Sequence, residues 1–88
     1  MVPHWSPRSQ VQTSLEPNEW FMMDRGRKVA ILRLLVVSGY NGKLFRSTTY
    51  SSVPLQRVLI GYFPTLDMAA HFTWMEWAKQ HPPVSDRK

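Results

Sequence analysis

The fold of this 88-residue chain is decided by residues 28–50, which read KVAILRLLVVSGYNGKLFRSTTY. Residues 28–37 are rich in β-branched and aliphatic side chains, and residues 43–50 alternate apolar and polar side chains as a half-buried strand does. Between them stands Asn41-Gly42, a dipeptide preferred in type I′ turns because both central residues there need a positive φ. The stretch therefore predicts a β-hairpin.

Further strands are expected on both sides of this hairpin. Residues 19–23 form a short apolar stretch, and residues 24–27 supply the Asp and Gly of a tight turn. Residues 56–63 read as another strand, with Val58, Ile60 and Tyr62 on one face and Arg57, Leu59 and Phe63 on the other. We expect three or four antiparallel strands between residues 19 and 63.

A C-terminal helix is predicted over residues 65–80. Thr65 is placed to cap the first exposed amides, Asp67 suits the positive end of the helix dipole, and the prolines at 82 and 83 cannot continue the helix. At 100° per residue one face gathers the side chains expected to pack on the sheet: Leu66, Ala69, Ala70, Thr73, Trp74 and Trp77. The predicted class is α+β, an antiparallel sheet packed against one C-terminal helix.

The chain divides into one domain and two flanking segments. Residues 1–17 hold three prolines among polar residues and are expected to form a flexible arm, because they have little to bury. The domain is expected to span residues 18–81, and residues 82–88 to form a flexible tail. Cysteine is absent and the N-terminus lacks an apolar run after a basic start, which favours a cytoplasmic protein with no membrane contact.

Positive charge is concentrated in the middle of the sequence. The net charge is +5, and no Asp or Glu occurs between Arg25 and Leu66. The same stretch contains seven cations: Arg25, Arg27, Lys28, Arg33, Lys43, Arg46 and Arg57. This concentration of positive charge attracts polyanions. Tyr40 and Tyr50 lie among these cations and supply rings on which bases can stack. These nine residues are the candidate nucleic-acid contacts, with DNA favoured over RNA.

One local resemblance supports DNA as the partner. Residues 57–70, RVLIGYFPTLDMAA, contain Gly-x-Phe-x-Thr, then an acid in the first helical turn, then Ala-Ala. This resembles the strand-to-helix junction of plant ethylene-response-factor DNA-binding domains and of the arm-binding domains of phage integrases. The resemblance implies a three-stranded sheet packed on a C-terminal helix, with the sheet entering the DNA major groove. It suggests an accessory protein of a mobile element.

A second interpretation rests on apolar side chains that the helix leaves uncovered. Met68, Phe72 and Met75 lie opposite the face expected to pack on the sheet, and exposed apolar patches usually mark association. The strand at residues 28–37 is also apolar on both faces, which is typical of a strand buried on both. The alternative function is therefore a protein-interaction or homodimerisation module.

Catalysis is not expected. His4 and His81 lie in the flanking segments, so Asp67 and His71, four residues apart on the helix, are the remaining candidate pair, and a solvated first turn explains them. The sequence has no phosphate-binding glycine loop, nucleophile elbow or zinc-binding helix motif. We therefore expect no catalytic residue, no metal, no cofactor and no small-molecule substrate.

Overall fold

The hairpin predicted from residues 28–50 forms the centre of the sheet. β3 (Arg27–Val36) pairs with β4 (Lys43–Thr49) in antiparallel register, from Ala30 opposite Thr49 to Val36 opposite Lys43. The computed structural model describes residues 7–36 and 42–80, so Asn41 and the conformation of the predicted turn lie outside the described residues. The pairing of the two strands confirms the hairpin.

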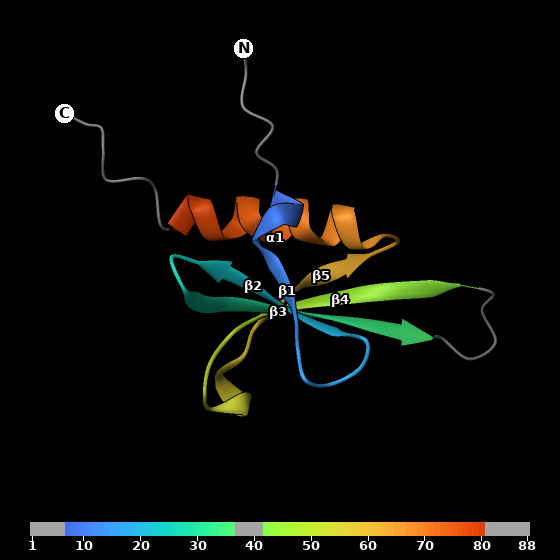
Figure 1. The fold of residues 1–88 in the computed structure, drawn as a ribbon, viewed down its shortest axis with the longest axis horizontal. Coiled ribbons are helices and arrows are strands. Elements are labelled where there is room, and N and C mark those ends of the chain that lie inside the picture. The colour runs from blue at the N-terminus through green and yellow to red at the C-terminus, as the bar shows by residue number, and fades with distance from the viewer. Residues whose placement is uncertain (1–6, 37–41, 81–88) are drawn as a thin grey trace, which may run out of the picture.

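Further strands extend the sheet on both sides in sequence order (Figure 1). β1 (Val11–Thr13) and β2 (Glu19–Asp24) precede the hairpin, and β5 (Leu59–Phe63) follows it. All neighbouring pairs are antiparallel. Two short 3-10 helices, η1 (Pro7–Gln10) and η2 (Pro54–Gln56), lie before β1 and between β4 and β5. With the C-terminal helix described below, the class is α+β, as predicted.

The sheet has five strands where the sequence predicted three or four. The additional strand is β1, which belongs to the segment expected to form the N-terminal arm and pairs Val11 with Met22. The side-chain amide of Gln10 donates to the carbonyl of Met23 at 2.9 Å and fixes the start of this strand. The sequence pattern did not reveal β1, because a strand of three residues with one buried side chain shows no alternation.

The turn between β2 and β3 is formed by Arg25 and Gly26. Both residues have positive φ, 53° for Arg25 and 79° for Gly26, and Asp24 pairs with Arg27 across the turn. Two central residues in the left-handed region are what a two-residue hairpin loop needs in order to match the twist of its strands. The turn predicted from residues 24–27 is confirmed.

Helix α1 (Leu66–Gln80) covers one face of the sheet (Figure 1). Thr65 caps it as predicted, since its hydroxyl oxygen accepts a hydrogen bond from the Met68 amide at 3.1 Å. Ala69, Ala70 and Thr73 are buried, and Trp74 and Trp77 pack against the core from its margin. The predicted helix and its predicted packing face are both confirmed.

Between α1 and the sheet lies a small, fully enclosed core. Met22 and Leu32 are 0% exposed. The hydroxyls of Ser47 and Thr73 form a hydrogen bond inside this layer, and the indole nitrogen of Trp77 donates to a carboxylate oxygen of Asp24 at 2.9 Å. The buried polar groups of the interface are therefore paired, as burial requires.

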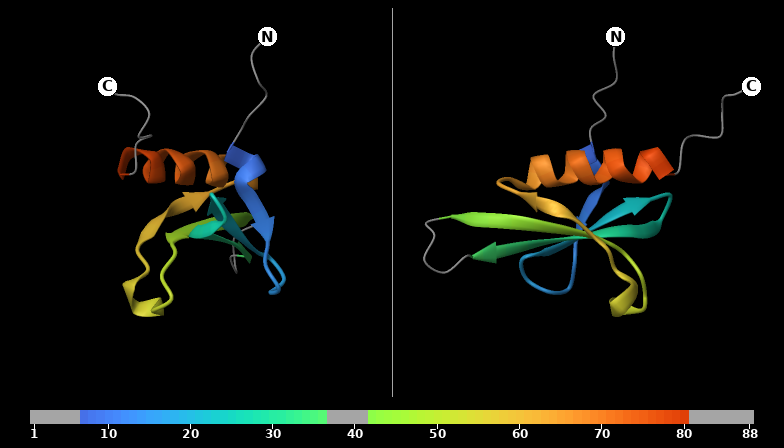
Figure 2. Two further views of the ribbon diagram at one scale, coloured as in Figure 1. Left: turned by 60° about the vertical axis from the view of Figure 1, so that its left-hand side comes forward. Right: turned by 180° about the vertical axis from the view of Figure 1, so that it is seen from behind.

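Two loops project from the sheet on the side away from α1 (Figure 2). We call residues 14–18, between β1 and β2, the Leu15 loop, and residues 50–58, which include η2, the Leu55 loop. Leu15 and Leu55 are fully exposed in these loops. The sheet face between them lies opposite the face that α1 covers, and we call it the open face. Among the described helices, none has the length and apolar character needed to cross a membrane.

Candidate nucleic-acid interface

Strand alternation determines which side chains reach the open face. Ser47 of β4 contacts Thr73 of α1, so its neighbours Arg46 and Thr48 point to the opposite side of the sheet. Directly opposite residues of antiparallel strands share a face. The pairing partners of Arg46 therefore form a row across the open face, which reads Glu19, Arg33, Arg46 and Tyr62 from β2 to β5.

A shallow depression of about 230 Å³ occupies the centre of this face. Ile31 lies on its floor and is only 7% exposed although α1 covers the other side of the sheet. The depression is lined by Glu19, Ile31, Arg33, Arg46, Thr48, Pro54 and Arg57. Pro54 and Arg57 come from the Leu55 loop, and Glu19 directly follows the Leu15 loop, so the two loops flank the depression.

The three arginines of the depression differ in how firmly they are held. Arg33 lies 3.5 Å from Glu19, whose other carboxylate oxygen accepts a hydrogen bond from Ser14. Arg57 donates from Nε to the carbonyl of Ser51 at 2.9 Å. Within residues 7–36 and 42–80, Arg46 has no ion pair or side-chain hydrogen bond. Arg46 is therefore a cation available to an external anion.

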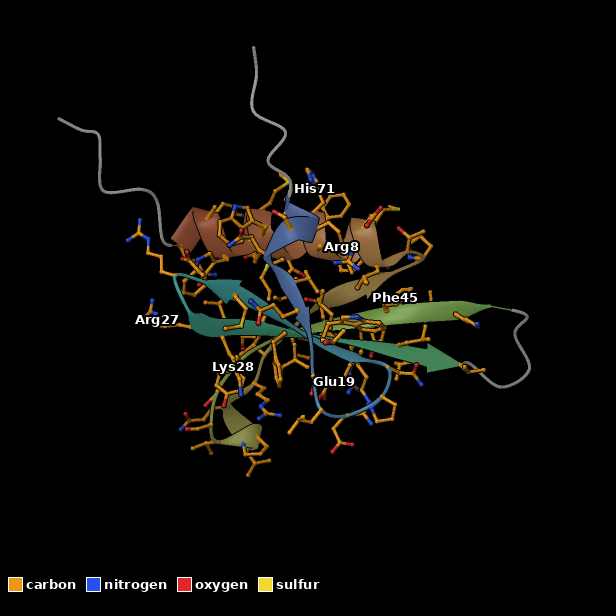
Figure 3. The ribbon with its side chains drawn as sticks, viewed as in Figure 1. Arg8, Glu19, Arg27, Lys28, Phe45 and His71 are labelled. Carbon is orange, nitrogen blue, oxygen red and sulfur yellow. The ribbon has the colours of Figure 1, made fainter. Side chains whose placement is uncertain are left out.

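Aromatic rings hold two cations, Lys28 and Arg57, at one end of the face. The Lys28 ammonium lies 4.4 Å from the ring centroid of Phe21 and 5.6 Å from that of Tyr50. The Arg57 guanidinium lies 5.4 Å from the Tyr50 ring. Such cation–π contacts hold a charge in place without neutralising it. Figure 3 shows Lys28 and Glu19 on the side of the sheet away from α1, whereas Phe45 lies on the α1 side.

The structure brings together five of the nine residues predicted to contact nucleic acid: Lys28, Arg33, Arg46, Tyr50 and Arg57. Arg25 and Arg27 lie at the β2–β3 turn, at one end of the sheet (Figure 3 labels Arg27). Lys43 begins β4 at the other end and shares its face with Phe45, on the α1 side. Tyr40 lies outside the described residues. The continuous basic stretch of sequence therefore divides among three places.

Sequence reasoning missed residues of the open face that become visible through strand register. Phe21 and Glu19 precede the basic stretch, and Tyr62 was assigned to the same face as Ile60. That assignment is wrong, because the register shifts between Ser47 and Thr48. The irregularity places Tyr62 and Leu59 on the open face, while Ile60 and Phe63 pack against the core. A sequence pattern of strict alternation contains no signal of such a bulge.

The outer side of α1 exposes the apolar side chains that the sequence singled out. Met68, Phe72 and Met75 are 41%, 43% and 48% exposed. Phe72 is partly engaged, because its ring stacks on Phe63 with centroids 5.4 Å apart. η1 packs beside this patch, so that a hollow of about 480 Å³ opens between Pro7, Arg8, Asp67, Met68, His71 and Phe72.

The carboxylate of Asp67 pairs with Arg8 at 3.5 Å across that hollow. Figure 3 shows Arg8 and His71 on this side of the molecule. In the described ranges, no three His, Asp or Glu side chains gather closely enough to hold a metal ion. Asp67 and His71 are both exposed, which is consistent with the expectation of a solvated first turn.

Comparisons of the chain with protein-family models, with curated protein sequences and with solved structures found no match.

Proposed function

We propose that this protein is a noncatalytic DNA-binding domain that holds the phosphate backbone on its open face. The observation that carries the proposal is the pairing of Arg33 and Arg46, which lie directly opposite each other on the two central strands. Arg57 lines the same depression, and Lys28 stands on the same face. A group of cations on one rigid surface neutralises several phosphates at once, and such contacts supply most of non-specific affinity.

The support is electrostatic and geometric. Guanidinium groups match phosphate with two parallel hydrogen bonds, and Arg33 and Arg46 are presented by strands whose backbone is fixed by pairing on both sides. Glu19 is the carboxylate that lines the depression, and its contact with Arg33 holds that side chain above the sheet. This arrangement favours backbone contact, which positions a nucleic acid without reading its sequence.

A salt titration of binding tests the proposal. A labelled oligonucleotide, single-stranded and as a duplex, is titrated with the protein at several salt concentrations. Affinity is expected to fall steeply as salt rises, because each neutralised phosphate releases a counterion. The combined change of Arg33, Arg46 and Arg57 to Gln is expected to weaken binding and to flatten the logarithmic salt slope by roughly 2 to 3, at about 0.7–0.9 per contact.

The matched control removes the same charge elsewhere. Arg8, Lys43 and Lys79 lie off the open face, and changing all three to Gln lowers the net charge equally. Surface ion pairs such as Arg8 with Asp67 contribute little stability, so this variant should fold. An equal loss of affinity in both triple variants would show that net charge, not the open face, governs binding. Absence of binding at low salt, where electrostatic association is strongest, would refute the proposal.

A protein-interaction or homodimerisation module is the second candidate. The observation that favours it is the exposure of Met68, Phe72 and Met75 along one side of α1. Because Phe72 stacks on Phe63, the cleaner test changes Met68 and Met75 to Ser and leaves that stack intact. If α1 mediates dimerisation, sedimentation will show a dimer that this double variant converts to a monomer while DNA affinity per chain persists. A wild-type monomer at all accessible concentrations would exclude homodimerisation.

A further inference from the structure

We propose that the open face takes single-stranded nucleic acid in preference to a duplex; this inference rests on the proposed nucleic-acid-binding function and narrows its ligand. The sugar–phosphate backbone would lie across Arg33 and Arg46, and an unpaired base would stack on Tyr62. Three features of the described residues carry the inference: the width of the sheet, the recess of its open face and the exposure of one aromatic ring.

The width of the sheet argues against entry into a duplex groove. The major groove of B-DNA is about 12 Å wide and admits a helix or a two-stranded ribbon. Five strands spaced by roughly 4.8 Å span about 19 Å between the outermost strand axes. The resemblance to ethylene-response-factor domains implied a sheet of three strands, and the two further strands make this sheet wider than the groove.

The open face is also recessed between its flanking loops. Its floor, at Ile31, is 7% exposed, whereas Pro54 and Arg57 of the Leu55 loop form one margin of the depression and Glu19, after the Leu15 loop, forms the other. Figure 2 shows both loops projecting beyond the strands on this side. A double helix would meet the loops before its base edges reached the strands. A single strand is thinner and flexible, and it can follow the recess.

Tyr62 supplies a ring that an unpaired base can reach. Tyr62 is 52% exposed and lies on the edge strand β5, directly opposite Arg46. Phe21 and Tyr50 already have cations over their rings, but among the described residues Tyr62 has no ring or cation contact. Base–aromatic stacking beside a basic groove is the usual way in which single strands are held without sequence preference. Bases inside a duplex are stacked on each other and cannot use this ring.

The test measures the affinity of the full chain for two probes in the same buffer. One probe is a mixed-sequence single strand without internal pairing, and the other is the duplex of that strand with its complement. The single strand is expected to bind more tightly. Tyr62→Ala is expected to weaken binding to the single strand about five-fold or more and to leave binding to the duplex unchanged. Tyr62→Phe, which keeps the ring, should retain the wild-type affinity, and Tyr62→Leu, which keeps apolar bulk without a π-face, should not. Far-UV circular dichroism of each variant checks that it is folded.

The outcomes separate this inference from the function on which it rests. Equal or tighter binding to the duplex, with Tyr62→Ala neutral for both probes, overturns the single-strand inference and leaves nucleic-acid binding in place. Absence of binding to either probe at low salt overturns the proposed function itself. An RNA strand of the same sequence is the third probe. Affinity for it that also falls with Tyr62→Ala supports the inference, because stacking and phosphate contact are common to both kinds of strand.

Discussion

The two faces of the sheet use neighbouring residues of the same strands for different purposes. On β4, Ser47 is buried and bonds to Thr73 of α1, whereas Arg46 beside it points to the open face. On β3, Leu32 is 0% exposed, whereas Arg33 beside it is exposed and lines the depression. Because side chains alternate along a strand, one hairpin supplies both the core and the cationic surface. Stability and binding can therefore be changed separately in adjacent residues.

The largest expected difference between the faces is at Leu32 and Arg33. Leu32→Ala is expected to lower the free energy of unfolding by about 3 kcal/mol, because it leaves a cavity under α1 where the side chain is fully buried. Arg33→Gln is expected to change it by less than about 0.5 kcal/mol, as most surface substitutions do, and to weaken DNA binding instead. Urea unfolding and the binding titration measure the two effects.

The opposite pattern would contradict the assignment of one face to the core and the other to binding. If Leu32→Ala were tolerated, the helix would not be packed on this face as the structure has it. If Arg33→Gln unfolded the chain, its contact with Glu19 would be a structural element of the fold and not a feature of a binding surface.

A smaller effect is expected at the hydrogen bond between Ser47 and Thr73. Ser47→Ala removes one partner and leaves the buried Thr73 hydroxyl without its bond, which should cost about 1–3 kcal/mol. Adding Thr73→Val removes the second polar group, so the double variant should be closer to the wild type than the sum of the two single changes. Additive losses measured by urea unfolding would show that the two hydroxyls do not depend on each other.

The fold was predictable where local chemistry specifies it. Asn41-Gly42 indicated the hairpin, Thr65 indicated the start of the helix, and the spacing of Ala69, Ala70 and Thr73 indicated its packing face. β1 was not predictable, because a strand of three residues with one buried side chain shows no clear alternation. It forms only by pairing with β2. Such an edge strand is specified by tertiary contact more than by its own sequence.

The positive charge of the candidate site was predictable from the sequence, but the set of residues that share its surface was not. The seven cations follow one another in the sequence, but which of them share a face depends on register, and register includes two irregularities, at Met22/Met23 and at Ser47/Thr48. The regular pairing of β3 with β4 places Arg33 opposite Arg46, and the position of Lys43 at the start of β4 sets it apart. The shift at Ser47/Thr48 brings Tyr62 onto the open face.

The most direct test of the open face as the binding surface observes its arginines during binding. The side-chain Nε–Hε resonances of Arg33, Arg46 and Arg57 can be followed by NMR as an oligonucleotide is added, with Arg8 beside α1 and Arg25 at the turn as internal references. We expect the resonances of the three open-face arginines to shift and broaden while those of the two references change little. Shifts confined to Arg8 and to the amides of α1, with Arg33, Arg46 and Arg57 unchanged, would contradict it.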